Sequence, residues 1–158
     1  IRLRHVQDFV SERFDLVSGI HDDAKVYQRG GAAVASYLQS LLRIMSAFVF
    51  VLHGTQKLFG FPSATPLPPS RMLSLLGAAG ILEACGGALM ALGLFTRPVA
   101  FILSGEMAVA YFRQHAPRGF WPILNGGELA ILFCFLWLFF SVAGPGPISV
   151  DTMVRRKK

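Results

Sequence analysis

The chain has 158 residues, of which 53% are hydrophobic and 15% are charged, and its mean hydropathy is +0.52. An ordinary soluble domain carries about 25% charged residues, so the composition argues against that class. The net charge of +6 does not indicate a nucleic-acid-binding protein, because the basic residues lie at the ends of apolar runs instead of along one stripe.

Residues 1–36 differ in composition from the rest of the chain. They contain five Lys/Arg and five Asp/Glu, so their charges cancel. Between the charges, apolar residues recur at roughly helical spacing: Leu3, Val6, Val10, Phe14, Val17 and Ile20. This pattern predicts a cytoplasmic N-terminal extension that forms an amphipathic helix on the inner membrane surface. A partly disordered tail is the alternative.

Prolines divide the remaining chain into four apolar segments, at residues 38–59, 72–95, 98–115 and 124–143. Each is close to the roughly 20 residues that a helix needs to cross a hydrocarbon core of about 30 Å. Short connections make consecutive helices antiparallel neighbours. We therefore expect an all-α integral membrane protein, with an antiparallel four-helix bundle over residues 37–152 and a basic cytoplasmic tail at 153–158.

The basic residues predict the orientation of this bundle. An even number of crossings places both termini on one side of the membrane. If that side is the cytoplasm, it receives Lys25, Arg29, Arg97 and the terminal Arg155–Lys158, while the outside receives Arg71, Arg113 and Arg118. Positive charge is enriched on the cytoplasmic side of membrane proteins. We expect a multi-pass protein of the bacterial inner membrane with both termini in the cytoplasm.

Polar residues inside the apolar segments are the candidates for function. A charge at mid-bilayer costs about 2.5–3.5 kcal/mol, so such residues should face inward and satisfy one another. Residues three or four apart share a helix face, which places His53, Gln56 and Lys57 together. We predict a cluster near the outer surface that continues to Glu83 and Glu106 and is closed by Arg43; its outer members are His53, Gln56, Lys57, Asn125 and Glu128.

The charges of this cluster suggest two roles. Three glutamates face two fixed cations, so the site should hold a shared proton. Glu83, Glu106 and Glu128 are then the candidate proton-relaying catalytic residues, and the candidate binding residues are Arg43, His53, Gln56, Lys57 and Asn125. A static network that fixes the helix register is the alternative. The two cysteines form no CxxC pair, so no metal site is predicted.

Several ordered motifs resemble those of the DoxX family of small four-helix membrane proteins. The resemblance extends over about residues 38–152 and is carried by "HGTQKLFGF" (53–61), "GILEACGGALMALGLFTRPVAF" (80–101), "GEMAVAYFRQHAPRGFWP" (105–122), "NGGELAILF" (125–133) and "GPGPISVD" (144–151). It implies the same fold as the apolar segments. It also implies that the family's polar positions correspond to His53, Gln56, Lys57, Glu83, Glu106, Asn125 and Glu128.

For function, the resemblance implies a link to membrane redox chemistry. The family is named after a subunit of a thiosulfate:quinone oxidoreductase, and some members resemble partners in thiol-redox complexes. The sequence contains no haem, flavin or iron–sulfur motif, so electrons would have to come from a quinone or a partner protein. We expect membrane lipid, other protein subunits and a quinone as partners, and no nucleic acid. The alternative is a non-catalytic membrane anchor or assembly factor that recruits other proteins.

Overall fold

The structure is a computed structural model that describes residues 2–62, 68 and 72–156, with side chains described from residue 30 onward. Contacts divide the chain into two units, Ile1–Ser36 and Tyr37–Lys158. In the first unit the described backbone is helical and forms the beginning of α1 (Arg2–Phe59). Its side chains up to residue 29 lie outside the described part, as do Arg71, Lys157 and Lys158. The amphipathic face of the extension therefore stays a prediction.

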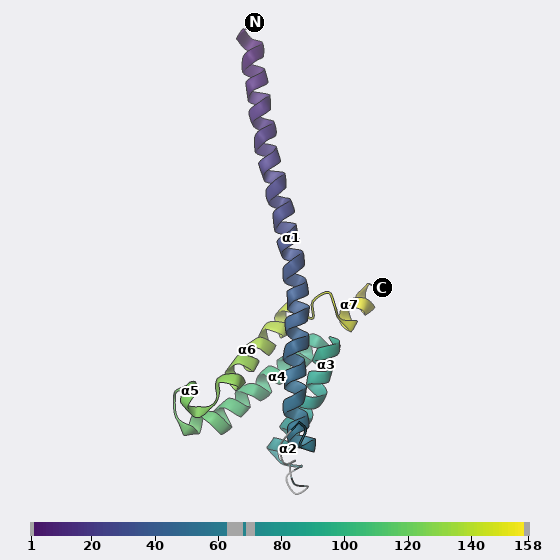
Figure 1. Cartoon of the computed structure of the whole chain (residues 1–158), viewed down its shortest axis with the longest axis vertical. Helices are drawn as coiled ribbons and strands as arrows, with labels where there is room; N and C mark the ends of the chain where they lie inside the picture. Colours follow the sequence, from purple (N-terminus) through teal and green to yellow (C-terminus); the bar gives the residue numbers. More distant parts are fainter. Residues whose placement is uncertain (1, 63–67, 69–71, 157–158) are drawn as a thin grey trace. The chain divides into compact units, whose positions relative to one another are not determined.

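The second unit contains the end of α1 and all the other elements, and Figure 1 shows their order along the chain. The regular structure of the described ranges is helical throughout, without a strand, which confirms the predicted all-α class. The further elements are α2 (Leu75–Ile81), the π-helical turn η2 (Leu82–Gly86), α3 (Gly87–Leu92), α4 (Thr96–Ala110), the π-helical turn η3 (Tyr111–His115), the 3₁₀ turn η4 (Ala116–Arg118), α5 (Pro122–Asn125), α6 (Glu128–Ala143) and α7 (Val150–Arg155).

The helices differ from the uniform spans that the apolar segments predicted. The second segment is helical from Leu75 to Leu92, but η2 interrupts its α-helical hydrogen bonding at the middle. The fourth segment is broken at Gly126, whose φ of 71° lies in the left-handed region that favours glycine. Asn125 therefore ends the short helix α5, and Glu128 begins α6, instead of both lying on one helix.

One apolar core draws on all four predicted apolar segments. Phe50 of α1 contacts Phe133 and Trp137 of α6, with ring centroids 5.2 and 5.3 Å apart. In the views of the ribbon, α4 runs beside α6, in agreement with their contacts (Figure 1). Met90 of α3 and Leu103 of α4 are buried in the same cluster. Because the core joins α1, α3, α4 and α6, it fixes how the polar side chains of these helices meet.

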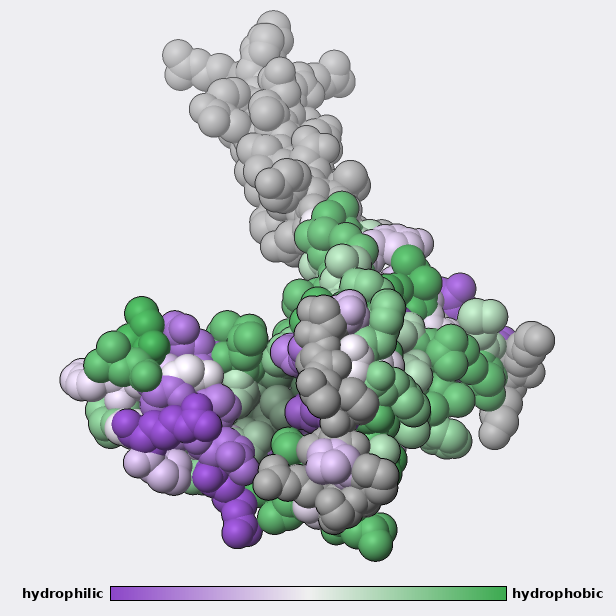
Figure 2. Space-filling model, turned by 60° about the horizontal axis from the view of Figure 1, so that its bottom comes forward, coloured by the Kyte–Doolittle hydropathy of each residue, from purple (hydrophilic) through white to green (hydrophobic). Residues whose placement is uncertain are grey.

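Besides this apolar core, the protein buries several polar side chains and exposes many large apolar ones. Side chains that are polar or charged are buried at Ser40, Arg43, Ser46, Glu83, Thr96, Ser104, Asn125 and Ser149. Large apolar side chains are exposed instead, among them Leu41, Phe48, Phe101, Leu132 and Phe135. In Figure 2 hydrophobic residues cover much of the visible surface, and a hydrophilic patch lies at the left. An exposed apolar surface of this extent marks contact with a membrane or a partner.

Two helices of the described residues are long and apolar enough to cross a membrane. They are Gly30–Phe59 and Leu75–Leu92. The apolar helix α6 is shorter. At about 1.5 Å per residue, the helical stretch of α4 and η3 approaches the 30 Å of a hydrocarbon core.

Candidate functional site

The site begins where α1 and the second apolar segment approach closely. A side-chain carbon added at Gly54 would collide with the backbone of Gly80 and Ala84. Only a glycine allows this approach, because any other residue would hold the two backbones apart. The contact places the last turn of α1 directly against η2.

At this contact Lys57 of α1 forms an ion pair with Glu83 of η2. The ammonium group of Lys57 donates a hydrogen bond to Oε1 of Glu83. The Lys57 side chain is 28% exposed, whereas that of Glu83 is 4% exposed. A buried carboxylate needs a charged or hydrogen-bonding partner, so Lys57 compensates the charge that the fold buries at Glu83.

Three other carboxylate oxygens near this pair have no partner. They are Oε2 of Glu83 and both Oε1 and Oε2 of Glu106, which are buried and accept no hydrogen bond from any residue that the structure describes. Trp137 Nε1 is also buried without a partner, but its ring is packed against Phe50, Phe133 and Phe140. Buried polar groups in proteins are nearly always hydrogen-bonded, so two unsatisfied glutamates at one place require an explanation.

Glu83, Glu106 and Lys57 line one pocket of about 470 Å³. Its walls are apolar and come from α2, η2 and α4; they include Leu75, Leu76, Leu82, Ile102, Met107 and Val109. Arg113, Gln114 and His115 of η3 complete the lining. Small-molecule sites typically enclose about 300–1,000 Å³ and combine apolar walls with a few polar groups. The pocket has this character, and we call it the glutamate pocket.

Both π-helical turns of the described chain contribute to the glutamate pocket. Glu83 belongs to η2, and Arg113, Gln114 and His115 belong to η3. A π-helical turn inserts one extra residue into an α-helix, and such turns occur frequently at functional sites. Here the two turns themselves carry these side chains, and an unbroken 3.6-residue period would have placed them elsewhere.

The structure places Arg43 at a separate site, not at the end of the glutamate cluster as predicted. Its guanidinium group is fully buried and donates hydrogen bonds to four backbone carbonyls, those of Met90, Ala91, Pro145 and Ile148. Ser40 lies one turn earlier on α1, and its hydroxyl accepts a hydrogen bond from the N–H of Ile148 at 3.2 Å. Arg43 thus binds the segment 144–149 to α1 and α3. We call this arrangement the arginine clasp.

Asp151 follows the clasp segment 144–149 in the chain, and its carboxylate binds the start of α4. Its carboxylate accepts hydrogen bonds of 2.9 Å from the backbone N–H groups of Phe95 and Thr96, where α4 begins. Partial burial by itself would raise the pKa of the Asp151 carboxyl, but these hydrogen bonds and the charge of Arg155 outweigh it. The pKa of Asp151 therefore lies below its usual value. A carboxylate at the start of a helix also interacts favourably with the helix dipole.

The other predicted site residues do not join the glutamate pocket. The ring of His53 lies edge-on to that of Phe133, with centroids 6.4 Å apart, and Gln56 is half-buried on the same helix. Asn125 is buried, but its side chain donates to the carbonyl of Gly119 and accepts from the N–H of Gly127, both at 2.8 Å. It therefore fixes a loop. Glu128 is exposed in the first turn of α6, because the break at Gly126 changes the register of this helix.

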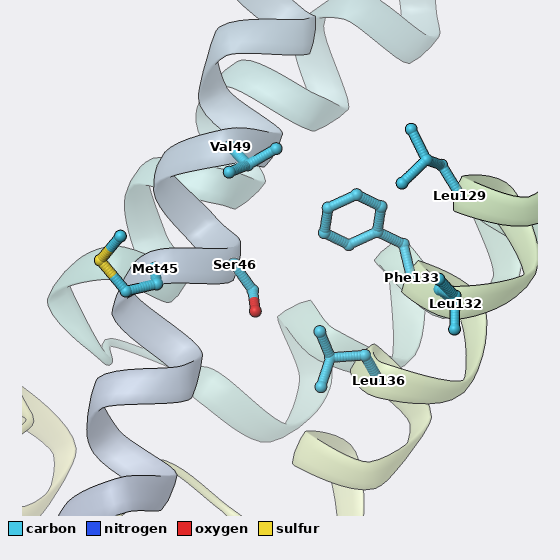
Figure 3. Close-up of a pocket in the computed structure, with 7 residues that line it drawn as sticks. All are labelled: Met45, Ser46, Val49, Leu129, Leu132, Phe133 and Leu136. Atoms are coloured by element: carbon cyan, nitrogen blue, oxygen red, sulfur yellow. The ribbon is translucent and has the colours of Figure 1, made fainter.

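A second pocket, of about 320 Å³, lies between α1 and α6. Figure 3 shows the side chains that line it: Met45, Ser46, Val49, Leu129, Leu132, Phe133 and Leu136. Ser46 is the one polar residue in this lining, and no ionisable group belongs to it. The second pocket can accommodate apolar groups but offers no residue that could transfer a proton or hold a charge.

Comparison with known proteins identifies the family. The DoxX family profile matches residues 38–116. The chain belongs to the DoxX family. It is also similar to an uncharacterized protein of Haemophilus influenzae, with 46% identity over 125 residues that cover 77% of this chain and 93% of the relative. No solved structure matches the chain.

Membership of the DoxX family, together with the two candidate spans, makes this a membrane protein. The DoxX match covers α1 from residue 38, the second apolar segment and α4 with η3. It therefore contains every residue that lines the glutamate pocket. The arginine clasp is only partly covered, because Pro145, Ile148 and Asp151 follow the matched residues.

Sequence reasoning missed three parts of this site. Arg113 follows Glu106 by seven residues and shares its helix face, and this spacing could have indicated that it lines the same pocket. His115 and the two π-helical turns gave no comparable signal in the spacing of the residues. The carbonyl groups that bind Arg43 are also invisible in the sequence, since every residue has one.

Proposed function

We propose that this DoxX protein is the membrane subunit of a quinone-linked or thiol-redox oxidoreductase complex, and that the glutamate pocket handles protons or a quinone head group. The observation that carries the proposal is the presence of unpartnered carboxylate oxygens of Glu83 and Glu106 beside Lys57, at an apolar pocket of about 470 Å³. Ionisable residues inside a membrane are expensive and are candidates for function by default.

The proposed arrangement is an antiparallel four-helix bundle in the bacterial inner membrane, with both termini in the cytoplasm. The shared core of α1, α3, α4 and α6 supports four crossings. The excess of basic residues at Lys25, Arg29, Arg97 and Arg155–Lys158 supports the orientation. In this orientation η3 and its Arg113 lie toward the outside, and the arginine clasp lies toward the cytoplasm.

The pocket residues have complementary roles in the proposal. The walls from α2 and α4 exclude water and bind an aromatic ring that enters from the bilayer. Lys57 donates a hydrogen bond to a ring oxygen, and Glu106 holds a proton within reach of that oxygen. When bound, a quinone supplies two-electron, two-proton chemistry, and the partner subunit supplies the electrons. Glu83 holds Lys57 in position through their ion pair.

Quinone binding to the purified protein tests this proposal. We expect a short-chain quinone to bind the protein in lipid nanodiscs with a single class of site, measured by quenching of intrinsic fluorescence. Lys57→Met removes the donor and should weaken quinone binding about ten- to hundredfold. This factor corresponds to the free energy of one charge-assisted hydrogen bond. Lys57→Arg keeps the charge and serves as the matched comparison.

A control variant excludes indirect effects. Cys85→Ser changes an exposed residue of η2 that does not line the pocket, and it should bind like the unchanged protein. Helix content and the elution volume in size-exclusion chromatography establish that each variant is folded. Absence of binding by both the quinone and its reduced form, or equal binding by folded Lys57→Met protein, contradicts the proposal.

The second candidate is a non-catalytic anchor or assembly factor that recruits partner proteins. The hydrogen-bonded arginine clasp and the Lys57–Glu83 pair favour it, because both tie helices together without any ligand. Under this candidate, Glu106→Gln should lower the amount of folded protein and leave the activity per molecule of an associated complex unchanged. Loss of that activity at a constant amount of folded protein rules the second candidate out.

A further inference from the structure

The unsatisfied atoms of the glutamate pocket are all of one kind. Oε2 of Glu83 and both carboxyl oxygens of Glu106 are buried acceptors without a donor in the described part of the chain. Glu83 itself is 3% exposed and lines the pocket. A ligand that fills this space must therefore bring hydrogen-bond donors to it.

Few hydrogen-bond donors line the pocket: Lys57, Arg113, Gln114 and His115, whose Nδ1 already pairs with the carbonyl oxygen of Asn125 at 3.1 Å. The ammonium group of Lys57 is bonded to Glu83, and its side chain is 28% exposed. Arg113 and Gln114 are exposed residues of η3. The buried surface that a ligand meets thus accepts hydrogen bonds, and donation is available mainly from Lys57.

We propose that the glutamate pocket binds the reduced form of its aromatic ligand, a hydroquinone, more tightly than the oxidised quinone. The inference rests on the proposed function and specifies which redox form the site selects. A hydroquinone carries two O–H donors that can reach the carboxyl groups of Glu83 and Glu106. A quinone carries two carbonyl acceptors instead, and only one of them can be satisfied by Lys57.

The protonation state of Glu106 does not reverse this preference. If both glutamates are ionised, three free acceptors face the ligand. If Glu106 carries a proton, it provides one O–H donor, while its carbonyl oxygen and Oε2 of Glu83 remain acceptors. A buried acceptor oxygen that faces another acceptor forms no hydrogen bond and keeps the full free-energy cost of its lost hydration. The hydroquinone, which brings hydroxyl donors, is therefore favoured in both protonation states of Glu106.

An ammonium ligand could also donate hydrogen bonds, but the charges at the pocket oppose it. The ammonium group of Lys57 already pairs with Glu83, and the guanidinium group of Arg113 adds a second positive charge to the lining. A neutral ring with hydroxyl groups avoids this repulsion. It also suits the apolar walls formed by residues such as Leu76, Leu82 and Ile102.

The test compares three probes that share one ring and one short isoprenoid tail: the hydroquinone, the quinone and the hydroquinone dimethyl ether. Binding of each to the full chain in nanodiscs is measured anaerobically by isothermal titration calorimetry. We expect the hydroquinone to bind at least tenfold more tightly than the quinone, and the dimethyl ether to bind no better than the quinone. A tenfold preference raises the midpoint potential of the bound two-electron couple by about 30 mV, which spectroelectrochemistry measures independently.

The variant Glu106→Gln keeps the shape of the side chain and adds an N–H donor. It should reduce the hydroquinone preference about tenfold, mainly by improving the binding of the quinone, and this gain cannot come from a loss of folding. Cys85→Ser should keep the full preference. The possible results have distinct meanings. Tighter binding of the hydroquinone supports the inference when Glu106→Gln reduces it, and overturns the inference when Glu106→Gln leaves it unchanged. Equal binding of both forms, or tighter binding of the quinone, overturns the inference and leaves the proposed function intact. Binding of neither form overturns both.

Discussion

The arginine clasp and the glutamate pocket both bury charged side chains within apolar helices, yet they satisfy them very differently. In the clasp, one guanidinium group binds four backbone carbonyls, and its Nε, Nη1 and Nη2 atoms all donate. In the pocket, the one ammonium group bonds to Oε1 of Glu83, and the other three carboxyl oxygens of Glu83 and Glu106 have no partner among the described residues. The first set of contacts is complete without a ligand, and the second is not.

This difference separates a structural role from a binding role. A satisfied buried charge contributes to one unique arrangement of the chain, because every alternative arrangement leaves it unpaired. An unsatisfied buried carboxyl group lowers the stability of the fold, and its presence is understandable when another molecule completes its hydrogen bonds. The comparison therefore assigns Arg43 to the fold, whereas Glu106 is the residue on which the proposed function depends.

The largest expected effect is at the clasp. Arg43→Met removes all four hydrogen bonds of the clasp and leaves buried carbonyl groups unsatisfied. Each uncompensated group costs about 1–3 kcal/mol of stability. We expect a loss of about 3 kcal/mol or more in the free energy of unfolding, measured by thermal unfolding in detergent micelles. Arg118→Met is the control, because Arg118 is exposed, and it should change stability by less than about 0.5 kcal/mol. Equal losses of stability in Arg43→Met and Arg118→Met would contradict the structural role of the clasp.

The effect at the pocket should have the opposite sign. Glu106→Leu replaces two unpartnered oxygens by an apolar side chain of similar size, and we expect a gain of about 1–3 kcal/mol in stability. The same unfolding measurement checks it, with Glu106→Gln as the variant that keeps a polar group. Ligand binding should be lost in Glu106→Leu although the protein is more stable. A clear loss of stability instead would mean that Glu106 is satisfied and structural.

The smallest effect concerns Asp151. Asp151→Asn keeps the shape but removes the charge that caps α4, so we expect a loss of about 1 kcal/mol at neutral pH. Because the pKa of Asp151 is lowered in the folded protein, its contribution is fully present above the unfolded pKa of about 3.9. It disappears as the pH falls through the folded pKa.

The difference in stability between the unchanged protein and Asp151→Asn follows this contribution alone, since other groups titrate in both proteins. We expect the difference to be constant from about pH 5 to pH 8 and to vanish at lower pH. Thermal unfolding of the two proteins in parallel measures it. A difference that grows with acidity would contradict the assignment of Asp151 as an ionised helix cap.

Part of the site could be predicted from the sequence because it depends on helix periodicity and on the cost of buried charge. The cost of a charge in the bilayer predicted that Glu83 faces inward, and the structure buries it against Lys57. Asn125 and Glu128 could not be placed, because the left-handed conformation of Gly126 shifts their register. The placement of Arg43 depends on carbonyl groups far away in the chain, at Pro145 and Ile148.

The sequence by itself determined the all-α class, its membrane character, and which residues would be too costly to expose to lipid, because these follow from apolar length and charge in any arrangement of the helices. Only the tertiary structure decided which of those residues meet. The approach of α1 to η2 at Gly54 sets the pairing of Lys57 with Glu83, and hydrogen-bond partners depend on contacts within a few ångströms. A shift of one residue in helix register changes such contacts, and the apolar pattern of the sequence does not specify the register to one residue.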